Sequence, residues 1–177
     1  PRPVNEIASI EAALPRAPFE AARDAAAVWR GRCLDLFARS EVAVTETLLV
    51  LAAVDGKGTS IKLPHLVGQR YDALASAVGV GGVFENEGKA AAGALSTFRR
   101  HDALRTQLAH GIFTVTLDHR GRWHLVARVV ALRAGRECRD VLATDQDETA
   151  ETFAAIEADG ARLRSTLGQL RRRLKIT

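Results

Sequence analysis

Apolar residues recur every three or four positions over most of this chain, which is the spacing of helices that bury one face. This spacing predicts one long helix over residues 19–54, with Gly31 as a point at which it kinks or splits. Residues 55–60 are rich in turn formers and predict a break. The pattern then resumes over residues 63–78 and predicts a second helix, with Gly79 as its C-cap.

A third helical pattern begins at Asn86, a residue type that caps helix N-termini, and ends near His110, where Gly111 stops it. A last helix is predicted over residues 145–174, with acids at its start and arginines at its end, as the helix dipole favours. Residues 144–147 resemble a capping box, with Thr first and Asp three positions later.

Between these last two helices, apolar residues recur at every second position, which is the pattern of β-strands. Residues 112–117 and 123–132 alternate clearly, and residues 137–142 form a weaker third strand. One face of the middle strand is apolar and carries Trp123, Leu125, Ala127, Val129 and Ala131. The predicted fold is therefore mainly α: a helical bundle of about four helices with an inserted antiparallel β-hairpin or small three-stranded sheet.

Length and composition fit a single domain. The chain has 177 residues, 47% of them hydrophobic and 26% charged. We expect an N-terminal arm over residues 1–18 and one helical domain over residues 19–177, with the β insertion at about 112–142. The longest apolar run, around residues 48–54, is too short for a membrane span, and the N-terminus lacks the apolar segment of a signal peptide. These features predict a cytoplasmic protein without a membrane partner.

The cysteines and the charge add little chemistry of their own. Cys33 and Cys138 are expected to be free, buried thiols rather than a disulfide, and no Cys/His spacing resembles a metal site, so no metal and no cofactor is expected. The net charge of +4 permits nucleic-acid binding without requiring it.

One short motif, Arg105-Thr-Gln-Leu-Ala-His110, is the strongest functional signal. In a continuous helix Arg105 falls on the apolar stripe of Ala91, Ala94 and Phe98, where a charge needs a partner. His110 ends the same helix, where the dipole favours imidazolium. Around a straight helix, a separation of five residues rotates the side-chain direction by about 140°, so the two side chains point apart. They serve one site only if the backbone turns at His110 or if a second subunit completes the site.

The motif and its Leu-Ala-His-Gly ending resemble the HEPN superfamily of helical bundles, whose members include metal-independent ribonucleases of toxin and defence systems. The family motif is an Arg, a polar residue that is most often Asn, and a His after four to six intervening positions near a helix end. Thr106 is polar but is not the common Asn. The motif covers six residues, and the looser resemblance covers the helices from about 19 to 174. The hairpin after the motif is similar to insertions in some members.

The resemblance implies a metal-independent endoribonuclease, a toxin or defence effector, that works as a homodimer with two motifs facing one cleft. His110 would act as general base or acid for the 2′-hydroxyl proton, and Arg105 would offset charge on the phosphate. Glu41, next to the apolar stripe of the first helix, matches the acidic helper that the family often carries on another helix; Glu46 is on the opposite side of that helix. We expect the dimer to bury part of the third or fourth helix.

Alternatives remain open at this level. The chain is alternatively a non-catalytic HEPN-like module that binds a nucleic acid or a protein partner, such as an antitoxin or regulatory protein. In that interpretation Arg105 forms a structural ion pair with a carboxylate such as Glu41, and His110 is only a helix cap. Arg99 and Arg100, with Thr106, are candidate RNA contacts, or else the two arginines belong to an exposed charged turn. An exposed cleft shared by Arg105 and His110 favours the enzyme, and a buried ion pair favours the module.

Overall fold

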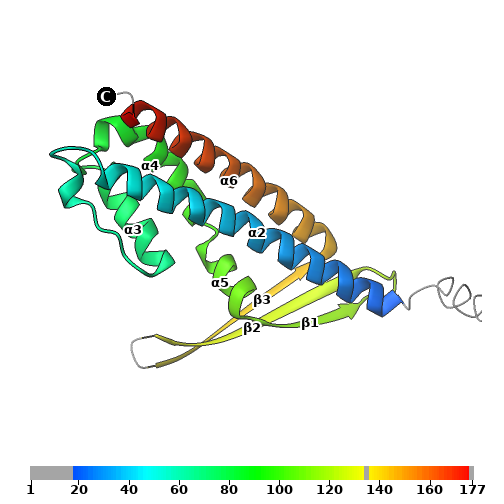
Figure 1. Ribbon diagram of the computed structural model, residues 1–177. Coiled ribbons are helices and arrows are strands. Elements are labelled where there is room, and N and C mark those ends of the chain that lie inside the picture. The colour runs from blue at the N-terminus through cyan, green and yellow to red at the C-terminus, as the bar shows by residue number, and fades with distance from the viewer. Residues whose placement is uncertain (1–17, 134–135, 176–177) are drawn as a thin grey trace, which may run out of the picture.

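The computed structural model describes residues 18–133 and 136–175 and is mainly helical, with a small three-stranded antiparallel sheet, as predicted. The two longest helices, α2 (Pro18–Ala52) and α6 (Gln146–Lys175), lie side by side (Figure 1). Helix α4 (Glu85–Arg99) packs on α6, and α3 (Val67–Val78) packs on α2 and α4. The predicted arm lies outside the described residues except for Pro18, which begins α2.

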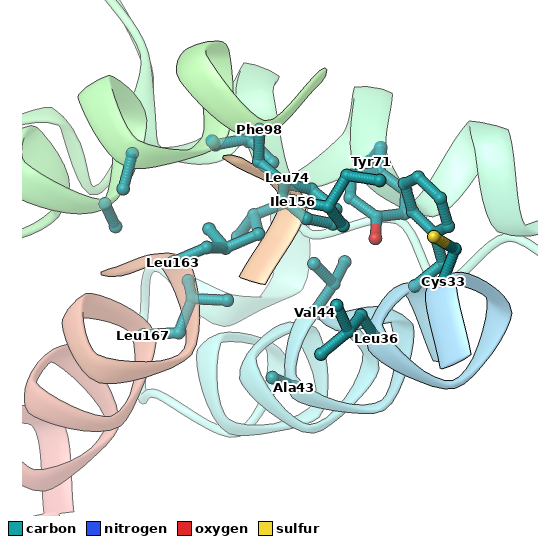
Figure 2. Close-up of a cluster of buried hydrophobic side chains, with 14 of the residues drawn as sticks. Cys33, Leu36, Ala43, Val44, Tyr71, Leu74, Phe98, Ile156, Leu163 and Leu167 are labelled. Carbon is teal, nitrogen blue, oxygen red and sulfur yellow. The ribbon is translucent and has the colours of Figure 1, made fainter. Parts of the chain in front are cut away.

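A continuous apolar core joins these helices to the sheet. Figure 2 shows part of it, where side chains from α2, α3, α4 and α6 meet. Its fully or almost fully buried members include Cys33, Phe37, Val44, Leu48, Leu74, Leu95, Phe98, Ile156, Leu163 and Leu167. Burial raises the pKa of the Cys33 thiol to about 12, only partly opposed by Arg32, so this cysteine stays protonated at neutral pH. Both cysteines are free, as predicted, although Cys138 is only half-buried.

Two glycines allow the helices to approach closely. A Cβ added at Gly88 on α4 would lie 2.5 Å from Cβ of Val78 on α3, a separation that real structures do not tolerate. On α6, a Cβ at Gly160 would lie 3.3 Å from both Phe98 and Ser40. Because these glycines carry no side chain, α4 can sit against α3 on one side and against α6 on the other.

The first two helices differ in detail from the prediction. Gly31 neither kinks nor splits α2, which runs unbroken. Helix α3 begins at Val67 rather than at residue 63, because the residue before Pro64 is disfavoured in a helix. The Arg70 side chain also binds the carbonyl oxygens of Pro64 at 3.1 Å and of His65 at 2.6 Å, which fixes this segment outside the helix. A short 3-10 helix, η1 (Gly58–Ser60), lies in the predicted break.

The predicted single helix over residues 86–110 is wrong, because the chain turns at Arg100 and His101. The result is two helices, α4 and α5 (Asp102–His110). The His101 ring contacts the Asp159 carboxylate on α6 at 2.9 Å and packs edge-on against Phe98 at 6.0 Å. This contact anchors the turn to α6, while α5 continues toward α2 and the sheet. Asn86 is not the N-cap either: Phe84 takes that position.

The sheet has the order β1 (Ile112–Leu117), β2 (Trp123–Arg133), β3 (Arg136–Asp145) and is antiparallel throughout. The apolar face predicted for β2 is confirmed from Trp123 to Val129, where alternate residues are buried against the helices. The side chain of Ala131, predicted for the same face, lies outside the described part of the structure. Strand β3 is longer than predicted, because its last residues pair with the beginning of β2. The predicted capping box lies one residue later: Asp145 accepts from the Glu148 amide at 2.9 Å, and Glu148 accepts from the Asp145 amide at 3.1 Å.

None of the helices in the described part of the chain combines the length and the apolar character that a membrane span requires.

Candidate functional site

The motif lies on α5, a nine-residue helix wedged between α2 and the sheet (Figure 1). The helix ends at Gly111, a position that only glycine fits, since an added Cβ would lie 2.4 Å from the carbonyl oxygen of Gln107. Only Leu108 is fully buried on this helix. The helix therefore presents most of its polar side chains at the surface of the protein or close to it.

Arg105 and Glu41 form an ion pair between α5 and α2. The Arg105 Nε atom donates to Glu41 Oε1 at 2.7 Å. The side chains are 30% and 23% exposed, so the pair is half-buried and not on a packed face. Arg105 does not share the stripe of Ala91, Ala94 and Phe98, because α5 starts after the turn. Its terminal nitrogens, Nη1 and Nη2, make no hydrogen bond within the described residues.

Tyr71 on α3 is a polar group that the sequence analysis did not single out. Its side chain lies in the core (Figure 2) and is 4% exposed, and its hydroxyl has no hydrogen-bond partner among the described residues. Burial raises the pKa of this hydroxyl, and the nearby Glu41 carboxylate raises it further, whereas Arg105 opposes both. Tyr71 therefore stays neutral beside the ion pair. The one available signal was that it is the only tyrosine in the chain.

His110 is the last residue of α5, and its side chain is exposed. It makes no hydrogen bond or ion pair with any part of the chain that the structure describes. Because Arg105 and His110 lie on one unbroken helix, the rotation of about 140° between them stands. Within one chain, therefore, the two side chains do not converge on one cleft, and His110 does not cap its own helix through a side-chain contact with the described residues.

The end of α5 is held instead by Arg30, a second residue that the sequence analysis missed. Arg30 Nε donates to the carbonyl oxygen of Leu108 at 2.7 Å, and Nη2 donates to that of Ala109 at 3.4 Å. The same guanidinium lies 4.3 Å above the ring of Phe113 on β1. Arg30 thus joins α2, α5 and β1 immediately next to His110. No sequence signal marks it, because these three elements meet only in the fold.

The other candidate residues are arranged as a charged turn. Arg99 bridges two carboxylates, Asp72 at 2.9 Å and Asp102 at 3.2 Å, so its charge is already compensated. The Arg100 side chain is 73% exposed and lies 3.9 Å from Asp159. The Thr106 hydroxyl donates to the Asp102 carbonyl oxygen at 3.1 Å, which is a helix-internal contact.

Of the two acidic candidates, only Glu41 reaches the motif. Glu46 contacts Arg171 on α6 at 3.3 Å, on the other side of α2. The structure therefore brings Arg105, Glu41 and Tyr71 together and leaves His110 and Arg100 separate.

In the described residues, no group of three or more His, Cys, Asp and Glu side chains is placed to hold a metal ion. Comparisons of the chain with protein-family models, with curated proteins and with solved structures found no match.

Proposed function

We propose that two copies of this chain form a metal-independent endoribonuclease whose cleft takes Arg105 and His110 from both copies. The observation that carries the proposal is the manner in which Glu41 holds Arg105. It occupies only the Nε edge of the guanidinium and leaves both terminal nitrogens open at a half-exposed position. A guanidinium fixed in this way can receive two oxygens of one phosphate.

The exposed His110, which has no partner within the described residues, supplies the acid–base group. The 2′-oxygen of a ribose attacks the adjacent phosphorus while His110 of one copy takes the hydroxyl proton. The bond from phosphorus to the 5′-oxygen breaks, and His110 of the second copy gives that oxygen a proton. Arg105 stabilises the charge that develops on the non-bridging phosphate oxygens. The products are a 2′,3′-cyclic phosphate and a 5′-hydroxyl, and the chemistry itself involves no metal ion.

A different observation favours a second candidate, a non-catalytic module that binds a nucleic acid or a protein. The Arg105–Glu41 pair is formed within one protomer, and the motif side chains point apart there. Both features also suit a helix whose arginine has a structural role. In this case the exposed residues of α5 and the Arg100 turn would contact the partner, and RNA would be bound without being cut.

The test is cleavage of a mixed RNA pool, with chelator present, by wild type, Arg105→Ala and His110→Ala. If the proposal is correct, wild type cuts and leaves cyclic phosphate ends, and both variants lose at least about 100-fold in rate. DNA of the same sequence resists, because it lacks the attacking hydroxyl. Arg23→Ala, a change of an exposed arginine on α2 that is not among the candidate RNA contacts, is the matched control and retains cleavage.

Two outcomes would contradict the proposal. Equal cleavage by wild type and His110→Ala would show a contaminating nuclease or another site. Binding of RNA by wild type without cleavage would identify the module instead. Circular dichroism of each variant establishes that loss of rate is not loss of fold.

A further inference from the structure

A cavity of about 420 Å³ lies where the beginning of α2 passes beside strand β1 (Figure 1). Its apolar walls come from α2 and from the inner face of the sheet: Phe19, Ala26, Ala27, Phe113, Val115 and Leu125. Binding sites for small molecules are typically concave, mostly apolar and about 300–1,000 Å³ in volume. The cavity is therefore large enough for a small ring compound, and its walls favour an apolar one.

Small side chains on α2 leave this space open. Ala26 and Ala27 line the cavity at positions where a larger residue would fill it. Phe19, on the same helix, is 46% exposed, so the described chain covers its aromatic ring only in part. A ligand in the cavity would remove this apolar surface from water, which favours binding.

The cavity is lined by two arginines, and its lining within the described residues contains no acidic side chain. Arg23 and Arg30 are seven residues apart, about two helical turns, so they lie on the same side of α2. Neither forms an ion pair with the described part of the chain. Glu20 and Asp24 line a neighbouring hollow that shares only Arg23 with this cavity among its charged residues. The half-buried Arg30 is therefore the cation whose charge has no carboxylate beside it.

Arg30 is held in place before any ligand arrives. Its Nε atom donates to the carbonyl oxygen of Leu108 at 2.7 Å, and its guanidinium lies 4.3 Å above the Phe113 ring. A carbonyl oxygen carries no net charge, so these contacts orient the guanidinium without neutralising it. Its Nη1 atom makes no hydrogen bond within the described residues. A cation fixed in this way binds a carboxylate with little loss of side-chain freedom.

A larger cavity, of about 600 Å³ between the ends of α2 and α6, lacks this imbalance of charge. Its lining includes Asp55 and Glu87 beside its cations, and Glu87 accepts from Lys57 Nζ at 2.7 Å. Acids and bases therefore accompany each other there, and the lining does not favour an anion.

We propose that the cavity between α2 and β1 binds a small aromatic carboxylate. The ring packs against the apolar walls, the carboxylate accepts hydrogen bonds from Arg30, and the exposed Arg23 adds a second positive charge at the mouth. The charge of the ligand follows from the arginines, because a half-buried cation is stabilised by a counter-charge. Its aromatic character follows from Phe19 and Phe113, which favour contact with a flat ring. The site does not depend on the proposed ribonuclease function.

Calorimetric titration of the full chain with naphthoate tests the site. Naphthoate should bind with a Kd below about 1 mM, and the neutral naphthalenemethanol should bind at least about tenfold more weakly, because it lacks the charge. Arg30→Gln should weaken naphthoate binding at least about tenfold, and Arg23→Gln about threefold. Arg162→Gln, at an exposed arginine on α6, is the matched control and should keep the wild-type affinity.

A second variant tests the cavity without touching a charge. Ala27→Leu should fill part of the space and weaken naphthoate binding at least about tenfold, whereas Ala38→Leu, at an exposed alanine further along α2, should not change it. Both positions are exposed, so neither leucine disturbs the core. Hydrogen exchange gives the location independently: naphthoate should slow the exchange of β1 amides and leave those of α3 unchanged.

Four outcomes would overturn the proposal. Absence of naphthoate binding to the full chain would remove the site. Equal affinity for naphthalenemethanol would remove the role of the two arginines. Unchanged affinity in Ala27→Leu, with no protection of β1, would place the ligand elsewhere. Tighter binding of uridine monophosphate than of naphthoate would identify a nucleotide as the occupant instead.

Discussion

At the scale of single residues, the Arg105–Glu41 pair is the feature on which both candidate functions depend. Its side chains are neither fully exposed nor fully buried, with 30% and 23% of their surface accessible. An exposed pair contributes little because water screens it, and a fully buried pair carries a large desolvation cost. At intermediate depth the attraction is less screened while each charge keeps part of its hydration.

A double-mutant cycle measures this pair. We expect Glu41→Gln and Arg105→Ala to be non-additive by about 1 kcal/mol in free energy of unfolding from urea denaturation. The matched control is the Asp35–Arg39 pair, in which both residues belong to α2. Its nitrogen–oxygen distance is also 2.7 Å, but its side chains are 56% and 65% exposed. That cycle should give less than about 0.5 kcal/mol. Equal coupling energies in the two cycles would show that burial does not strengthen the Arg105–Glu41 pair.

At the scale of elements, α5 is short and depends on its neighbours. It has nine residues, and an isolated helix of that length is not stable in water. Glu41 and Arg30, both from α2, hold it at its middle and at its end. The position of His110 is therefore determined by α2 as much as by α5.

Removal of the Arg30 side chain should loosen the end of α5. Arg30→Ala deletes a charged donor to the last carbonyl oxygens of α5 and the contact with Phe113. Together these interactions stabilise the end of α5 by about 1 kcal/mol. Amides of α5 should then exchange with solvent at least about fivefold faster in hydrogen-exchange measurements. Arg23→Ala, on the same helix but at an exposed residue that forms no hydrogen bond or ion pair with the described part of the chain, should not change them. Unchanged exchange in Arg30→Ala would mean that packing alone holds the helix.

At the scale of the whole molecule, one core connects the bundle with the sheet. Trp29 on α2 and Trp123 on β2 both belong to it and are 8% and 7% exposed. The Trp29 indole also donates to the Thr149 carbonyl oxygen at the beginning of α6, at 2.9 Å. The two tryptophans therefore report on the helices and on the sheet within the same packed region.

Unfolding should be cooperative across both parts. We expect far-UV circular dichroism, which follows the helices, to show the same urea midpoint as the fluorescence of variants that keep a single tryptophan. Trp29→Phe leaves the sheet probe, and Trp123→Phe leaves the helix probe. Midpoints that differ between fluorescence and dichroism within either variant would show that the sheet unfolds as a separate unit.

The sequence alone determined the elements whose local pattern is strong. The period of apolar residues predicted α2, α6 and the strands, and the alternation in β2 identified its buried face, because these patterns reflect the geometry of one element. It also suggested Glu41 as a partner for Arg105, although the reason was wrong: the apolar stripe on which Arg105 was placed belongs to α4 and does not continue into α5.

Only the tertiary structure decided where the helix over residues 86–110 breaks and what surrounds the motif. The turn at His101 depends on Asp159, which lies 58 positions further along the chain. The end of α5 depends on Arg30, which lies 78 positions before Leu108 and 79 before Ala109. The buried hydroxyl of Tyr71 beside the ion pair likewise results from the packing of α3 on α2. Such contacts leave no periodic pattern, because they join elements whose separation along the chain has no fixed relation to their separation in space.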